Sequence, residues 1–149
     1  MKKFIFLSLL AFATMQVSYA QLSKAVADFK SETTGKLLDT VVNATTKFQQ
    51  VKVSKSASAV YFQATATKIS GTTAGIVRLF GSNDGIAWKR VTATGTLSAA
   101  DSLNLANVAT PQTIFFKDAP SQYLFYRVSV AGSGTASTQF RSVAVADQK

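Results

Sequence analysis

Residues 59–69, AVYFQATATKI, decide the fold class of this chain. Apolar residues occupy every second position of this segment: Val60, Phe62, Ala64 and Ala66. The positions between them, from Tyr61 to Thr67, all carry polar groups. A strict period of two is typical of a strand that buries one face and exposes the other, as strands of antiparallel sheets do. The segment therefore predicts an antiparallel β-sheet with one buried face.

Strand-like sequence continues through the rest of the chain from Lys36 onward. Turn-forming residues at 70–72, 82–85, 118–121 and 132–135 separate the strand-like runs. The sequence predicts an all-β fold, a single antiparallel β-sandwich over residues 36–149 with about eight strands. The expected strands are Leu37–Val42, Phe48–Val53, Ala59–Ile69, Gly75–Gly81, Trp88–Thr94, Thr113–Lys117, Tyr123–Ala131 and Ala136–Val145. The stretch from Gly95 to Pro111 fits neither pattern, and we expect a long loop or an irregular edge strand there.

A different pattern precedes the predicted sandwich. In residues 22–32, LSKAVADFKSE, the apolar residues Leu22, Val26 and Phe29 recur at helical spacing. This spacing predicts a short helix or arm within residues 21–35.

The first 20 residues have the three parts of a secretory signal peptide. Lys2 and Lys3 are followed by the apolar run 4–12, FIFLSLLAF, and by the segment 17–20, VSYA. Small residues at Ser18 and Ala20 fit the recognition pattern of signal peptidase. The apolar run is shorter than the roughly 20 residues of a membrane span. We expect cleavage after Ala20 and export to the periplasm, the cell surface or the medium.

Composition excludes several kinds of site. The chain has no histidine and no cysteine, which removes Ser-His-Asp and Cys-His catalysis and sites with histidine or cysteine metal ligands. Its seven acidic residues are far apart in sequence, so we expect neither an enzyme nor a cofactor or metal. Removal of Lys2 and Lys3 leaves 14 basic residues against 7 acidic ones, a formal charge of +7. This excess favours anionic partners, but the basic residues are scattered, and a nucleic-acid binder more often clusters them with aromatic residues.

Residues 77–91, VRLFGSNDGIAWKRV, carry the candidate binding residues. Two strand-like runs flank the turn 82–85, where Gly85 can adopt a left-handed conformation. The candidate ligand-binding residues lie in and after this turn: Asn83, Asp84, Trp88, Lys89 and Arg90. Trp88 is either a stacking surface for a sugar or a core residue at the end of the hairpin. Asn83 and Asp84 fit turn formation better than Ca²⁺ ligation, which needs more oxygen ligands than one turn offers.

The turn also carries a resemblance. Residues 81–88, GSNDGIAW, resemble the G-S-x-D-G-x-x-W hairpin of small β-sandwich modules in bacterial surface proteins and in bacteriophage virion and tail proteins. Discoidin-like sandwiches are similar more distantly. Residues 122–130, QYLFYRVSV, look like the penultimate strand of the same modules. The resemblance implies a non-catalytic module of a surface or a virion.

These observations support two hypotheses. The first is a secreted, non-enzymatic binding or adhesion module for a glycan or an anionic surface polymer. The second is an assembly protein, either a phage virion surface component or an extracellular fibre subunit, which would form a homo-oligomer or join a particle.

The signal peptide predicts the N-terminus of the exported protein. N-terminal sequencing of the secreted form is expected to begin at Gln21, because Ala20 ends the cleavage site. An intact Met1 terminus would contradict the assignment of residues 1–20.

Overall fold

The computed structural model describes residues 24–53, 57–92 and 102–148. The expected signal peptide lies outside these ranges. In the described part of the chain all regular secondary structure is β-strand. No helix long and apolar enough to cross a membrane occurs there. The predicted all-β class is confirmed.

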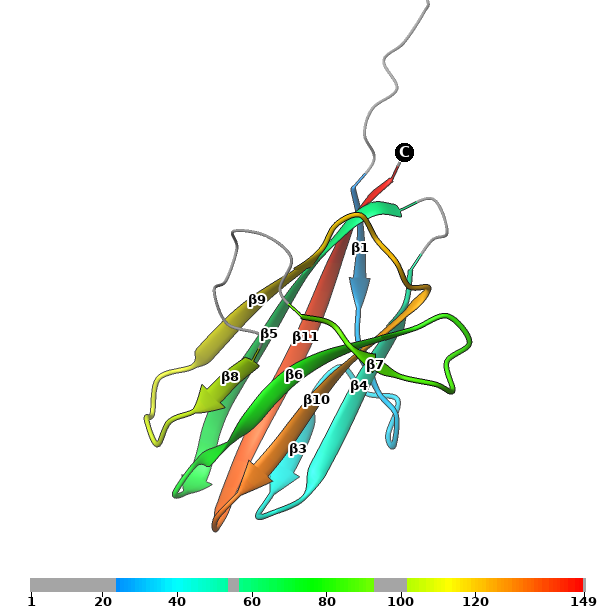
Figure 1. Ribbon diagram of the computed structural model, residues 1–149. Helices are drawn as coiled ribbons and strands as arrows, with labels where there is room; N and C mark the ends of the chain where they lie inside the picture. Colours follow the sequence, from blue (N-terminus) through cyan, green and yellow to red (C-terminus); the bar gives the residue numbers. More distant parts are fainter. Residues whose placement is uncertain (1–23, 54–56, 93–101, 149) are drawn as a thin grey trace, which may run out of the picture.

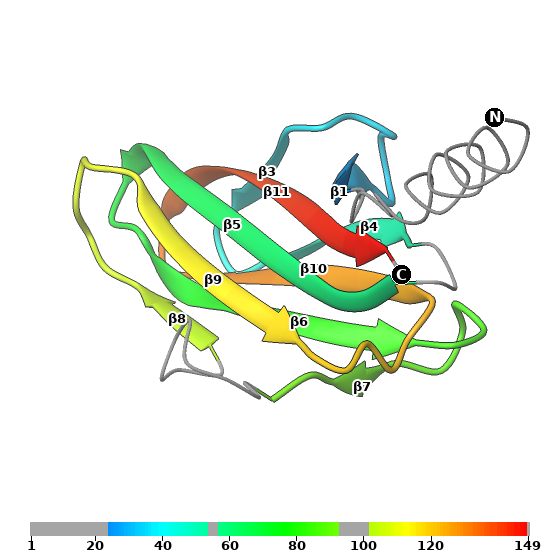
Figure 2. The ribbon, with the colours of Figure 1, turned by 90° about the horizontal axis from the view of Figure 1, so that it is seen from above.

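Two antiparallel sheets lie face to face and form a sandwich (Figures 1 and 2). One sheet has five strands: β1 (Lys24–Asp28), β3 (Asp39–Val42), β5 (Ala57–Gly71), β9 (Gln112–Asp118) and β11 (Ala136–Gln148). The other sheet has six: β2 (Lys30–Ser31), β4 (Thr46–Lys52), β6 (Ala74–Ser82), β7 (Lys89–Arg90), β8 (Ser102–Leu105) and β10 (Phe125–Ser133). Figure 2 shows the two layers from above.

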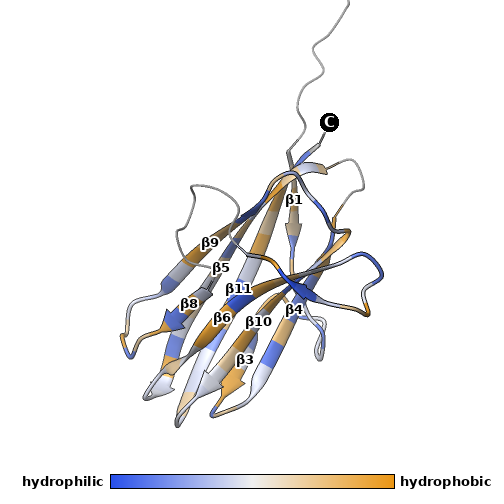
Figure 3. Ribbon diagram, viewed as in Figure 1, coloured by the Kyte–Doolittle hydropathy of each residue, from blue (hydrophilic) through white to orange (hydrophobic). Residues whose placement is uncertain are grey.

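The longest strands, β5 and β11, pair along almost their whole length. On the other side of β11, β3 pairs with its first residues and β1 with its last ones. The buried face of β5 contains Val60, Phe62, Ala64 and Ala66, each at most 3% exposed, as the alternation predicted. Figure 3 colours the strands by hydropathy and shows hydrophobic and hydrophilic residues along the ribbons of both sheets.

The predicted helix at residues 22–32 is wrong where the structure describes it. Residues Lys24–Asp28 form β1 on the five-stranded sheet, and Lys30–Ser31 form β2 on the six-stranded sheet. The chain crosses between the sheets at Phe29, whose ring is fully buried and whose N–H donates to the Ser142 carbonyl. Val26 is 68% exposed, so Val26 and Phe29 do not share the buried face that a helix would give them. The pairing of β1 with β11 outweighs the local preference for a helix that their spacing indicated.

The irregular stretch from Gly95 to Pro111 is described from residue 102 onward, and that part contains a strand. Ser102–Leu105 forms β8, which pairs with the edge of β6 beside β7. The expected strand Trp88–Thr94 is described only to residue 92, and within that range β7 comprises Lys89 and Arg90.

Aromatic rings connect the two sheets inside the core. Phe29 packs edge-on against Phe62, and Phe62 packs at 4.6 Å between ring centroids against Tyr126 from the opposite sheet. The Tyr126 hydroxyl is buried and donates a hydrogen bond to Asp118 at the end of β9. Asp118 also accepts the backbone N–H of Gln122, so one carboxylate fixes the connection between β9 and β10.

This buried bond makes stability depend on pH and on the Tyr126 hydroxyl. Burial, and after it the bond to Asp118, raises the pKa of Tyr126 above its ordinary value near 10. The stabilisation is complete below pH 10 and is lost above it, because the unfolded chain then releases a proton that the fold retains. Tyr126→Phe is expected to lower the free energy of unfolding by about 1–3 kcal/mol at pH 7. It should also weaken the loss of stability above pH 10, measured by denaturant unfolding.

The matched control is Tyr61→Phe, because Tyr61 lies on the outer face of β5. We expect it to change the free energy of unfolding by less than about 0.5 kcal/mol. Equal effects of the two substitutions would show that the Asp118 bond contributes no specific stability.

Candidate functional site

The hairpin that carries the predicted binding residues is present. β6 and β7 pair through Phe80 with Arg90 and through Gly81 with Lys89. Gly85 has a φ of 76°, the left-handed conformation predicted for it. Gly81 is required for a different reason: a Cβ atom at this position would lie 2.2 Å from the ring of Tyr123, which packs on it.

Asp84 organises the turn. Its Oδ1 accepts hydrogen bonds from the backbone N–H groups of Ile86 and Ala87 and from the Ser82 hydroxyl. These donors, the Ile86 N–H most of all, lower the pKa of Asp84 below its usual value. Asn83 is exposed beside it. No cluster of three or more possible metal-ligating side chains occurs in the described ranges, and the contacts of Asp84 are those of a turn.

Trp88 lies on the outer face of the six-stranded sheet and is half-buried there. The guanidinium carbon of Arg127 is 4.3 Å from the centroid of Trp88 and also 4.3 Å from that of Phe48. Arg127 is therefore stacked between two rings, one from β4 and one from the hairpin. One face of the Trp88 ring is occupied by this contact, so a sugar would have to use the other.

Lys89 and Arg90 point to opposite sides of β7, and both are exposed. They border a cavity of about 100 Å³ together with Asp118 and Tyr123. The hairpin residues thus fall into three settings: the turn at Asn83 and Asp84, the stack at Trp88, and this cavity.

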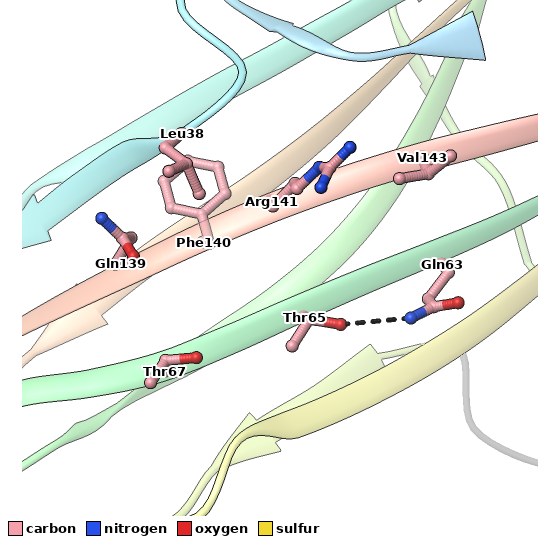
Figure 4. A pocket seen from close by; sticks show the side chains of 8 residues that line it. All are labelled: Leu38, Gln63, Thr65, Thr67, Gln139, Phe140, Arg141 and Val143. Atoms are coloured by element: carbon pink, nitrogen blue, oxygen red, sulfur yellow. Dashed lines mark hydrogen bonds between the residues drawn. The ribbon is translucent and has the colours of Figure 1, made fainter.

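A larger hollow, which the sequence did not reveal, lies on the outer face of the five-stranded sheet (Figure 4). Its volume is about 330 Å³. We call it the trough, and define it by the outward side chains of β5 and β11 that line it: Gln63, Thr65, Thr67, Gln139, Arg141 and Val143. Leu38, from the segment before β3, also lines the trough (Figure 4), as does Phe140, although the Phe140 side chain is buried in the core.

Strand register brings these residues together. β5 and β11 pair Gln63 with Val143, Thr65 with Arg141, and Thr67 with Gln139. Residues paired in this way share a face of the sheet, with Cβ atoms about 5 Å apart. The alternation in 59–69 predicted that Gln63, Thr65 and Thr67 face outward, but only the register identifies the side chains opposite them.

The trough is lined by amide and hydroxyl groups and one guanidinium. The Gln63 amide donates to the Thr65 hydroxyl over 3.4 Å, and Thr65 bonds to Thr113 of β9 over 3.0 Å. Arg141 forms an ion pair with Asp28 over 3.0 Å, and both side chains are about half exposed. The lining side chains include no carboxylate, so the chemistry that the trough offers is hydrogen bonding.

An apolar hollow of about 150 Å³ continues from the trough along the same face. The two share Gln63 and Val143. Tyr61, Val145 and Phe115 form the rest of its outer surface, and Phe115 is 47% exposed. Polar and apolar contact surfaces thus lie side by side across β9, β5 and β11.

Comparison with known proteins finds solved structures of low similarity to this chain. No protein-family model and no curated protein matches the chain. A solved structure described as "CBM4 structure and function" is 15% identical, with a TM-score of 0.47 over 87% of this chain and 81% of that one. The CBM22-1 xylan-binding domain from Paenibacillus barcinonensis Xyn10C is 6% identical, with a TM-score of 0.45 over 81% of this chain and 86% of that one. A pilus protein of Bacillus endospore appendages is 14% identical, with a TM-score of 0.41 over 89% and 97%.

The stack of Trp88 on Arg127 predicts a contribution to stability. Trp88→Ala is expected to lower the free energy of unfolding by about 1–2 kcal/mol, because it removes one of the two rings that cover the guanidinium. Urea unfolding measures the change. Ile86→Ala in the same hairpin is the control, since Ile86 is 84% exposed and its loss should have little effect. An unchanged stability of the Trp88 variant would show that the stack contributes nothing.

Proposed function

We propose that this chain is a non-enzymatic glycan-binding module and that the trough on the five-stranded sheet is its binding site. The observation that carries the proposal is the row of amide and hydroxyl side chains beside an apolar surface. Sugars present hydroxyl groups at the rims of their rings and C–H groups on the ring faces. A site for them therefore needs both kinds of contact within one hollow.

The trough has these two kinds of contact in adjacent positions. Gln63 and Gln139 can each donate and accept hydrogen bonds, and Thr67 adds a hydroxyl. Gln63 on β5 is paired with Val143 of β11 on one side and with Phe115 of β9 on the other, and Phe115 is 47% exposed, so a polar group lies directly between two apolar ones. The trough and the apolar hollow share Gln63 and Val143, so a ligand longer than one sugar ring could contact both.

Most described acidic side chains have structural contacts, which supports a binding role over a catalytic one. Asp28 and Glu32 are in ion pairs with Arg141 and Arg127. Asp118 is buried against Tyr126, and Asp84 holds its turn. Asp39 accepts the hydroxyl of Ser31. Glycoside hydrolysis needs two carboxyl groups facing each other across the substrate, and no carboxylate lines the trough.

Export completes the proposal. The signal-peptide pattern of residues 1–20 would deliver the module to the cell surface or beyond, where polysaccharides are available as ligands. Adhesion to such a polymer is the role that we propose for the exported protein.

The test is a double substitution in the trough. A glycan array would first identify a neutral oligosaccharide that binds, and titration calorimetry would then compare variants. Gln63→Ala with Gln139→Ala is expected to weaken binding about thirtyfold, since each of the two lost hydrogen bonds contributes about 1 kcal/mol. The melting temperature should stay close to that of the unsubstituted protein.

Gln50→Ala is the matched control, because Gln50 is exposed on the outer face of the opposite sheet. It should bind the oligosaccharide as the unsubstituted protein does. Absence of neutral glycans among the array hits, or equal losses in the control and the trough variant, would reject the proposed site.

Assembly is the second candidate function, and the edge of the five-stranded sheet favours it. In the described part of the chain, β9 pairs with β5 along one side and with no strand along the other. Such an edge can accept a strand from another copy. Sedimentation velocity distinguishes this role, since a monomer at high concentration would count against fibre formation.

A further inference from the structure

The outer face of the six-stranded sheet concentrates positive charge. One row of paired residues crosses five strands from β2 to β7: Lys30, Gln50, Arg127, Phe80 and Arg90. Lys52 and Arg78 lie on the same face, two residues along β4 and β6 from this row. We call the four residues Lys30, Lys52, Arg78 and Arg127 the basic face.

Negative charge is scarce around the basic face. Glu32 contacts it, through an ion pair of 3.7 Å with Arg127. Asp84 lies in the neighbouring turn, where its Oδ1 already accepts three hydrogen bonds. The other acidic residues that the structure describes lie on strands of the five-stranded sheet: Asp28, Asp39, Asp118 and Asp147. The fold therefore separates most carboxylates from this group of cations.

Arg127 holds a fixed position at the centre of the face. The ring centroids of Phe48 and Trp88 both lie 4.3 Å from its guanidinium carbon, and that of Phe80 lies 5.8 Å from it. Its Nε is buried without a hydrogen-bond partner. The Arg127 side chain is 19% exposed, and a charge in such a partly buried environment attracts an anion more strongly than one in bulk water.

The spacing of the cations suits a polymer with regularly placed charges. Neighbouring strands are about 4.8 Å apart, so Lys30 on β2 and Arg127 on β10 are separated by about 10 Å across the sheet. A chain crossing the strands could contact them in turn.

The aromatic residues distinguish among polymers. Single-stranded nucleic acids bind through bases that stack on aromatic rings. Here the facing sides of Phe48 and Trp88 are occupied by Arg127, and Lys52 lies 5.4 Å over the ring of Phe125. These rings therefore position cations, and it is the cations that would contact the ligand. We propose that the basic face is a second binding site, separate from the trough, for an acidic polysaccharide with sulfate or carboxylate groups.

The test compares two pairs of lysine substitutions with the same change in net charge. Lys30→Gln with Lys52→Gln alters the basic face, and Lys68→Gln with Lys117→Gln alters β5 and β9 of the other sheet. The pairs are matched further, since Lys52 lies over the ring of Phe125 at 5.4 Å and Lys117 over that of Tyr61 at 5.5 Å. Binding to heparin and to polygalacturonate is measured at several NaCl concentrations.

We expect the basic-face pair to weaken heparin binding about tenfold at 0.1 M salt and to reduce the salt dependence, because fewer counterions are released. The control pair should change affinity by less than about threefold. Equal losses in the two pairs would show that the net charge alone attracts heparin and would overturn the proposal. Tighter binding to a single-stranded oligonucleotide than to heparin would overturn it in favour of nucleic acid.

The trough variant Gln63→Ala with Gln139→Ala separates this site from the proposed function. It should bind heparin with unchanged affinity, whatever it does to neutral glycans. A parallel loss of heparin binding in this variant would show that the ligand occupies the trough and would overturn a second site.

Discussion

The pairing of β5 with β11 is the constraint on which the rest of the structure depends. These two strands form the centre of the five-stranded sheet and supply much of its buried face. Along the outer edge of β11, β1 and β3 pair at opposite ends, and Phe29 bonds to the carbonyl of Ser142 between them. Because Phe29 enters the core at that point, the same edge determines where the chain crosses to the opposite sheet. The register of this pair also aligns Gln63 with Val143 and Thr67 with Gln139, so the candidate binding surface depends on it.

The sandwich has two outer faces of different chemistry. The face of the five-stranded sheet combines amides, hydroxyls and exposed apolar groups, and its guanidinium, Arg141, is paired with Asp28. The face of the six-stranded sheet positions its cations by means of aromatic rings, above all at Arg127. Hydrogen bonding to neutral groups and attraction of charged groups are thereby separated by the thickness of the core. One small domain can present both to different parts of a complex surface.

Local patterns in the sequence predicted the parts of the fold that depend on near neighbours. Alternation along residues 59–69 identified a strand and its buried face, and Gly85 marked the turn that Asp84 completes. Contacts between distant segments could not be read in this way. The spacing of Val26 and Phe29 suggested a helix, because the neighbouring sequence gives no sign of their distant contacts. Val26 pairs with β11, and Phe29 is buried in the core. Trp88 was identified as a candidate, but its contact with Arg127, 39 positions later, depends on the pairing of β6 with β10. The sequence did not reveal the trough, because its lining residues come together only through the register of β5 with β11.

The antiparallel pairing of β1 with β11 has a consequence for how the domain can be connected to other proteins. Lys24 lies opposite Asp147, so the two ends of the described fold are adjacent at one pole of the sandwich. A domain with adjacent ends can be inserted into a loop of a host protein or circularly permuted without rethreading its sheets. If the domain were joined to another protein at this pole, the outer faces of both sheets would remain exposed.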